Sequence, residues 1–179
     1  MRVPKSRLLC TLAALVVLTS AGQVAAQRQP AVTTVVLVRH AEKIDASRDP
    51  GLSEAGEERA HQLARVLADF RFDAVLSTPF IRTRETGRPL ATQMGVPITE
   101  TPVTRAFASD LAARLRADYA GQTVLVVGHS NTTPDVMRAL GVPNVAAMAD
   151  HEYDDLFIVT LLPGGSARAV HLHYGRPTP

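Results

Sequence analysis

The sequence predicts an α/β fold in which helices flank a mostly parallel central sheet, giving three layers. Two β-branched and almost continuously apolar segments, residues 33–38 and 123–127, have the pattern of strands that are buried on both faces. Segments with helical spacing of apolar residues alternate with the strands, which is typical of a parallel sheet. The chain has 179 residues, 46% apolar and 20% charged, which fits one folded domain and argues against disorder.

The other elements are predicted from apolar periodicity, capping residues and turn residues. A helix capped by Ser53 comes first, followed by a strand over 74–76 and a helix over 81–93, in which Pro89 predicts a kink or a later start. Next come a short strand at Ile98, a helix around Leu111 and Leu115, and a helix capped by Thr132 or Thr133. The last two elements are strands over 156–162 and 167–174, joined by a hairpin at 163–165.

Residues 1–26 are predicted to be a secretory signal, followed by the mature domain over 27–179. Arg2, Lys5 and Arg7 precede an apolar run of 11 residues at 8–18, and small residues at 24–26 supply a cleavage site. The alternative is an uncleaved anchor, although a membrane-spanning helix takes about 20 apolar residues. We therefore expect an exported protein, periplasmic or secreted, with no membrane attachment after cleavage.

Charge and cysteine content narrow the function of the mature domain. The formal net charge of the whole chain is +2, but the first 26 residues contain three basic residues and no acidic one. The mature domain is thus close to neutral without a basic stripe, so we expect no nucleic-acid partner. Cys10 is the only cysteine and lies in the predicted signal, which excludes disulfides, thiol catalysis and cysteine-bound zinc from the mature domain.

Two arginines and two histidines follow predicted strands at their carboxyl ends, where ligands bind in open α/β sheets. Arg39 and His40 end the first strand, His129 follows Gly128 at the end of another, and Arg82 comes a few residues after the short strand. Arginine binds phosphate with a permanent charge, and an imidazole can attack phosphorus. We therefore predict a phosphate pocket, and we predict that the chain turns after Arg39 so that Arg39 and His40 both face it.

The chain resembles the histidine phosphatase superfamily, also called the phosphoglycerate mutase-like family. Four ordered blocks carry the resemblance: residues 38–43 (VRHAEK), 52–56 (LSEAG), 77–83 (STPFIRT) and 127–131 (VGHSN). It implies a phosphoglycerate mutase-like fold, with His40 as the nucleophile that forms a phosphohistidine. Arg39, Arg82 and His129 would be catalytic and would bind the substrate. The family's usual Arg-His-Gly is Arg-His-Ala here, and Ala46 replaces an asparagine of mutase-type members, which favours the family's small phosphatases.

The resemblance implies a phosphatase without cofactor or metal, acting on a small phosphorylated substrate, either a phosphomonoester or a phosphohistidine of a protein. The alternatives are a phosphoglycerate mutase-type phosphotransferase and a catalytically silent protein that binds a phosphorylated ligand. The general acid that protonates the leaving group is Glu100, Asp110 or absent. The sequence specifies neither the substrate nor the oligomeric state.

Several other polar residues have two interpretations each. Glu42 and Lys43 either touch the substrate or form a solvated loop, and Ser130 and Asn131 either donate to phosphate or cap the following helix. His171 and His173 share one face of a strand and could bind zinc together with His151. No acidic ligand pattern accompanies these histidines, so we predict no metal site.

Overall fold

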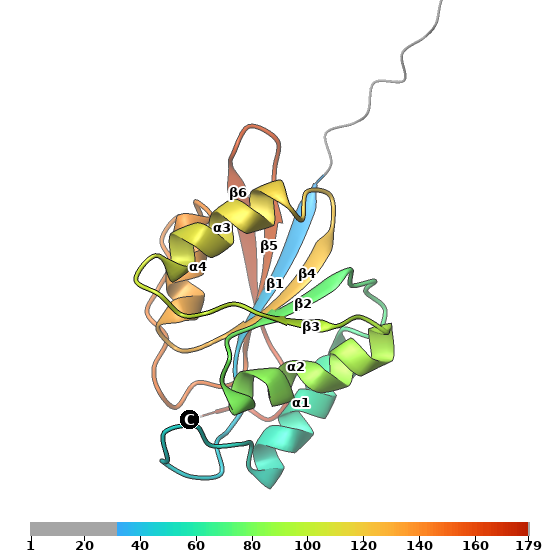
Figure 1. Ribbon diagram of the computed structural model, residues 1–179, viewed down its shortest axis with the longest axis vertical. Helices are drawn as coiled ribbons and strands as arrows, with labels where there is room; N and C mark the ends of the chain where they lie inside the picture. Colours follow the sequence, from blue (N-terminus) through green and yellow to red (C-terminus); the bar gives the residue numbers. More distant parts are fainter. Residues whose placement is uncertain (1–31, 179) are drawn as a thin grey trace, which may run out of the picture.

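The computed structural model describes residues 32–178 of the chain (Figure 1). The predicted signal and its cleavage site lie outside these described residues. No helix within residues 32–178 is long and apolar enough to cross a membrane.

Six strands form one sheet in the order β3-β2-β4-β1-β5-β6. The strands are β1 (Thr33–Arg39), β2 (Ala74–Ser77), β3 (Ile98–Glu100), β4 (Thr123–Gly128), β5 (Asp155–Leu161) and β6 (Ala167–His173). The pairs β2–β3, β2–β4 and β1–β4 are parallel, whereas β5 pairs antiparallel with both β1 and β6. The predicted α/β fold with a mostly parallel central sheet is confirmed.

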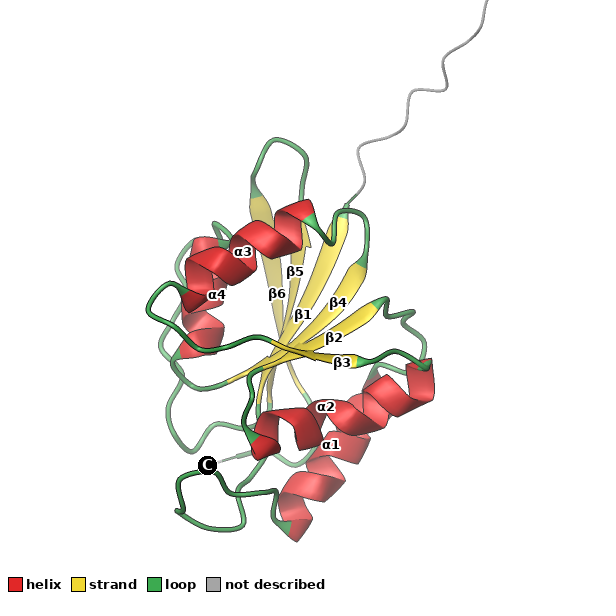
Figure 2. Ribbon diagram, viewed as in Figure 1, coloured by secondary structure: helices red, strands yellow, loops and turns green. Residues whose placement is uncertain are grey.

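Four helices cover the two faces of this sheet in pairs (Figure 2). They are α1 (Glu54–Val66), α2 (Ile81–Met94), α3 (Phe107–Ala117) and α4 (Thr132–Ala139). Val36 and Val38 of β1 pack into the core beneath α1 and α2, and Val35 and Leu37 pack into the core beneath α3 and α4. All four side chains are fully buried because successive residues of a strand point to opposite faces, each covered by helices.

The predicted element boundaries hold with small corrections. Ser53 caps α1, since its hydroxyl accepts a hydrogen bond from Gly56 N at 3.2 Å. Pro89 lies inside α2, which begins at Ile81, so the later start is wrong. The strands of the C-terminal hairpin are each displaced by one residue at one or both ends, which is the scatter expected at strand termini.

Candidate active site

A cavity of about 440 Å³ lies at the carboxyl ends of β1 and β4 and beside the first turn of α2. Its walls bring together all four residues predicted to form the phosphate pocket, along with eight others. The lining residues are Arg39, His40, Lys43, Phe80, Arg82, Val103, His129, Ser130, Asn131, Thr132, Asp150 and Tyr153. The geometry places the four residues; their catalytic roles stay predictions.

The parallel pairing of β1 with β4 places the two imidazoles next to each other. Arg39 is opposite Gly128 in this register, and His40 N donates to Gly128 O at 3.0 Å. The residues that directly follow these two, His40 after β1 and His129 after β4, have ring centroids 5.3 Å apart. β1 ends at Arg39, and both Arg39 and His40 line the cavity, as the sequence predicts.

Gly128 permits the tight connection from β4 into α4. A Cβ atom at this position would lie 2.9 Å from the hydroxyl oxygens of both Thr132 and Thr133, which is closer than real Cβ contacts. The Thr132 hydroxyl accepts a hydrogen bond from His129 N at 2.9 Å. The backbone of His129 is therefore fixed by the start of α4.

His40 is held in the tautomer that a nucleophile requires. Its Nδ1 lies 2.8 Å from Ala41 O, and because a carbonyl oxygen only accepts, Nδ1 carries the hydrogen. In the neutral ring, Nε2 then has the free lone pair. Burial, with smaller contributions from the charges of Arg39 and Arg82, lowers the pKa of His40 to about 3. The ring is consequently neutral at pH 7.

The tautomer of His129 follows from a chain of buried hydroxyl groups. The one hydrogen of the Thr83 hydroxyl is shared between the carbonyl oxygens of Thr78 and Phe80, at 2.9 and 2.8 Å, so this hydroxyl accepts from the Thr78 hydroxyl at 2.9 Å. Having donated its only hydrogen, the Thr78 hydroxyl accepts from His129 Nε2 at 2.9 Å. Nδ1 of His129 is therefore the nitrogen that can take up a proton.

His129 is neutral before a ligand binds. Burial, reinforced by the positive charges of Arg82 and Arg39, lowers its pKa to about 4. A phosphate dianion in the cavity would offset those positive charges and favour protonation of the ring. A protonated His129 would therefore depend on a bound anion and is not a property of the free protein.

Arg39 is buried and fixed by the segment that follows α4. Its Nη1 donates to Ala149 O at 2.8 Å and to Glu152 O at 3.0 Å, and its guanidinium lies 4.2 Å from the ring centroid of Tyr153. Nε is buried and has no hydrogen-bond partner within residues 32–178. A donor left unpaired in a buried cationic group points to an anionic ligand.

Arg82, like Arg39, has buried guanidinium nitrogens without a hydrogen-bond partner in the described part of the chain. These are Nε and Nη1, and the guanidinium lies 4.4 Å from the ring centroid of Phe80. Asp49 approaches Nη1 only to 3.6 Å, while its Oδ1 accepts from Ile81 N at 2.9 Å. Burial and the positive charge of Arg39 lower the pKa of Arg82, while the negative charge of Asp49 raises it by less. The net lowering indicates an excess of positive charge at the cavity.

Neither predicted candidate for the general acid lines the cavity. Glu100 is exposed on β3 and pairs with Arg84, at 3.3 Å, and Asp110 is exposed in the first turn of α3. Among the lining residues, Asp150 is the single carboxylate. Its side chain is 94% exposed and accepts a hydrogen bond from the Ser130 hydroxyl at 2.8 Å. Of the three predicted alternatives, the structure places neither Glu100 nor Asp110 at the cavity, and the general acid stays a prediction.

The structure shows which of the polar residues with two interpretations line the cavity. Lys43 lines the cavity, whereas Glu42 accepts hydrogen bonds from Nε and Nη2 of the buried Arg59, at 2.7 to 3.0 Å. Ser130 and Asn131 both line the cavity. Asn131 is also the N-cap residue of α4, without a capping hydrogen bond from its side chain. Thr132 and Thr133 lie within the helix, so the prediction that one of them caps it is wrong.

Three contributors to the site were not recognised in the sequence: Tyr153 beneath Arg39, Phe80 beneath Arg82, and the Thr78–Thr83 hydroxyl pair behind His129. Thr78 and Thr83 flank Arg82 inside the resembling block 77–83, so their position was a usable signal. Tyr153 follows 13 residues with no strand or helix, and local pattern alone does not connect it to Arg39.

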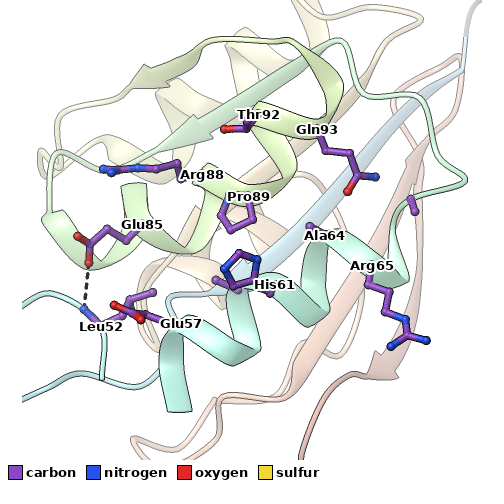
Figure 3. Close-up of a pocket in the computed structure, with 12 residues that line it drawn as sticks. Leu52, Glu57, His61, Ala64, Arg65, Glu85, Arg88, Pro89, Thr92 and Gln93 are labelled. Carbon is purple, nitrogen blue, oxygen red and sulfur yellow. Dashed lines mark hydrogen bonds between the residues drawn. The ribbon is translucent and has the colours of Figure 1, made fainter. Parts of the chain in front are cut away.

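A larger cavity, of about 710 Å³, lies between α1 and α2 (Figure 3). Its walls carry charged and polar side chains of both helices, including His61, Arg65 and Arg88. Glu85 at one end accepts a hydrogen bond from Leu52 N at 3.0 Å. None of the four predicted site residues lines this cavity, so size alone does not locate the candidate active site.

The sheet and its flanking helices have the phosphoglycerate mutase-like fold, with the cationic cavity beyond the carboxyl ends of the parallel strands. The model of the histidine phosphatase superfamily, branch 1, matches residues 35–108, which include Arg39, His40 and Arg82. This partial match, together with the fold shared with solved structures of this class, confirms the resemblance to the histidine phosphatase superfamily. His129 lies beyond the matched residues, and its place beside His40 comes from the structure.

Solved structures share the fold at low sequence identity. The protein histidine phosphatase SixA, complexed with tungstate, is 20% identical, with 78% of this chain and 96% of that chain covered and a TM-score of 0.64. A mycobacterial glucosyl-3-phosphoglycerate phosphatase is 17% identical, with 80% and 98% covered and a TM-score of 0.58.

Phosphoglycerate mutase from Bacillus anthracis is 16% identical, with 80% of this chain and 93% of that chain covered and a TM-score of 0.61. The three proteins are named for three different activities, so the shared fold does not select among them. No curated protein matches the chain.

Proposed function

We propose that this protein is a phosphatase that transfers a phosphoryl group to His40 and then to water. The observation that carries the proposal is the pairing of a neutral His40, whose Nε2 lone pair is free, with buried guanidinium nitrogens that have no partner within residues 32–178. The first group is a nucleophile, and the second would hold the oxygens of a phosphate.

The first chemical step forms a bond between His40 Nε2 and phosphorus and breaks the bond from phosphorus to the leaving oxygen or nitrogen. The imidazole gains positive charge as this happens, and its Nδ1–H strengthens its hydrogen bond to Ala41 O. Arg39 and Arg82 neutralise charge on the phosphoryl oxygens. His129, protonated at Nδ1 when the phosphate binds, donates a further hydrogen bond.

The second step regenerates the enzyme. Water attacks phosphorus, the bond from phosphorus to Nε2 breaks, and the water releases a proton as inorganic phosphate forms. His40 returns to the neutral tautomer because Ala41 O retains the hydrogen on Nδ1. Among the lining residues no carboxyl group is enclosed, so leaving groups that depart without a strong acid are favoured.

The substrates we propose are phosphomonoesters, and export of the chain would favour these. A phosphohistidine of another protein is a second candidate, supported by the lack of an enclosed acid, since imidazole is a good leaving group. The SixA structure is named for a protein histidine phosphatase and shares the fold. Assays with an aryl phosphate, an alkyl phosphate and a phosphohistidine peptide compare these leaving groups directly.

Acid and base quenching with a phosphorus-labelled aryl phosphate tests the nucleophile. We expect a protein-bound label that is lost in acid and kept in base, as for a phosphohistidine. His40→Ala should give no label and lower kcat by about 10⁴-fold or more. His151→Ala is a matched control, because His151 is exposed and does not line the cavity.

The outcomes separate the proposal from its alternatives. A label that survives acid, or that still forms in His40→Ala, would refute the mechanism. Phosphate binding without turnover would identify a silent binding protein. Transfer of phosphate between the two positions of a phosphoglycerate would identify a mutase.

A further inference from the structure

We propose that Asp155, His171 and His173 form a binding site for one divalent transition metal ion, with zinc as the ion that the donor set fits best. The three residues lie on the outer strands β5 and β6, and none of them lines the cavity that holds His40. Two imidazole nitrogens and one carboxylate oxygen are ligands that zinc takes at three of its four positions, the fourth being water.

The register of the β5–β6 hairpin places these side chains on one face. Asp155 is directly opposite His173, and Phe157 is directly opposite His171. Residues two apart along a strand share a face, and so do residues directly opposite each other. The arrangement is therefore set by backbone pairing and does not depend on a flexible loop.

The ligand atoms are already close together. Asp155 Oδ1 lies 2.6 Å from His171 Nε2 and 3.5 Å from His173 Nδ1, and one ligand atom from each residue lies within 4.8 Å of the others. Zinc bonds of about 2.1 Å in a tetrahedral site imply ligand atoms about 3.4 Å apart. Small side-chain rotations of the two exposed histidines would reach that spacing.

The surroundings hold the ligands in place. The Asp155 side chain is 9% exposed, and the His171 ring stacks on Phe157 with centroids 4.4 Å apart. Asp154 Oδ2 lies 3.4 Å from His173 Nδ1, and the Asp154 carboxylate accepts a hydrogen bond from the Thr178 hydroxyl. Both imidazoles thus already direct a nitrogen toward buried carboxylates.

This cluster differs from the one considered in the sequence. His151 is exposed in a turn and is not part of it, and the acidic ligand that the sequence pattern lacked is Asp155, brought in by strand pairing. A metal here would fasten β6, the edge strand, to β5 (Figure 1). The site has no part in the phosphoryl-transfer mechanism proposed above.

Zinc titration of the untagged protein against a chromophoric chelator tests the proposal. We expect one equivalent to bind, with an affinity lowered at least about tenfold in His171→Ala, in His173→Ala and in Asp155→Asn. His61→Ala and His151→Ala are controls that remove exposed histidines outside the cluster and should leave the affinity unchanged. Cobalt should give the visible spectrum of a tetrahedral site in the wild type and lose it in the first two variants.

A stability measurement gives a second readout. Zinc should raise the Tm of the wild type and leave the Tm of folded His171→Ala and His173→Ala unchanged, because a ligand stabilises the state that binds it. These two exposed positions keep the test valid if Asp155→Asn does not fold. Failure to bind one equivalent, or equal binding in His171→Ala, would overturn the proposal.

The candidate active site also holds a close pair of imidazoles, those of His40 and His129, which could bind the zinc instead. Binding that is lost in His129→Ala and retained in His171→Ala would place the metal in the cavity and overturn the proposal. Phosphatase activity enters none of these measurements, so failure here and failure of the proposed function are distinguishable.

Discussion

Replacing Arg59 with methionine removes the group that fastens the loop after His40 to the rest of the fold. Arg59 is 3% exposed. Its guanidinium donates to the Glu42 carboxylate at 2.7 to 3.0 Å, to Tyr174 O at 3.0 Å and to Arg176 O at 2.9 Å. Methionine keeps much of the buried volume and none of the five hydrogen bonds.

The expected loss of stability follows from the burial of the pair. Removing one partner of a buried ion pair costs about 3–5 kcal/mol, because the remaining charge is left without compensation. The Glu42 side chain is 21% exposed and regains some hydration, so the lower end, about 3 kcal/mol, applies. For a domain of this size that corresponds to a fall in Tm of about 6–12 °C.

Urea unfolding measures the change, and Arg138→Met is the matched control. Arg138 pairs with Asp135 at 2.8 Å, but both side chains are about half exposed, and such surface pairs contribute at most about 1 kcal/mol. Glu42→Gln and the double variant complete a cycle that isolates the pair itself. A loss in Arg59→Met no larger than in Arg138→Met would refute the reasoning.

The remaining predictions concern pH, the hydroxyl chain, metal removal and export. Unfolded His40 titrates near 6.5 and native His40 near 3, so the unfolded state takes up a proton as pH falls from 7 to 5 and the native state does not. The free energy of unfolding should fall over this range, and His40→Ala should remove about 2 kcal/mol of that fall. Urea unfolding at pH 7 and at pH 5 measures the fall, and an equal fall in the wild type and in His40→Ala would contradict this prediction. Thr78→Val removes the acceptor for His129 Nε2–H, so kcat should fall about tenfold with little change in KM, and an unchanged kcat would show that the tautomer is fixed otherwise. Chelation should leave kcat unchanged because guanidinium groups supply the charge on the phosphate, and a loss restored by zinc would contradict that. N-terminal sequencing of protein from the native host should begin near Gln27, whereas a chain that retains residues 1–18 and fractionates with membranes would exclude cleavage.

The parts of the site that the sequence predicts are those fixed by local chain geometry. Arg39, His40 and His129 end or follow strands that are apolar throughout, and parallel strands bring such ends to one edge of a sheet. Pattern alone therefore located the pocket. The register that sets the two imidazoles side by side, with Arg39 opposite Gly128, required the structure.

The parts that sequence reasoning missed depend on contacts between distant residues. Arg59 lies at a helical position where a charge ordinarily faces solvent, yet it is buried by carbonyl groups more than 110 residues away. Tyr153 and Asp150 reach the cavity from a segment with no strand or helix. Asp155 joins His171 and His173 only through antiparallel pairing, which no spacing rule along the chain can show.

The strand order also determines when the candidate active site can form during folding. β1, which ends at Arg39, pairs only with β4 and β5, so its two neighbours are residues 123–128 and 155–161. The segment that matches the family model, residues 35–108, contains neither neighbour. In that segment alone, β1 would have no strand to pair with on either side, because β4, which lies between β1 and β2 in the sheet, would be missing. Pairings between such distant segments form slowly, because a long loop must close before any contact is gained. His40 therefore follows a strand whose second neighbour becomes available only after more than four-fifths of the chain, so the position of its imidazole depends on pairing across the whole sheet.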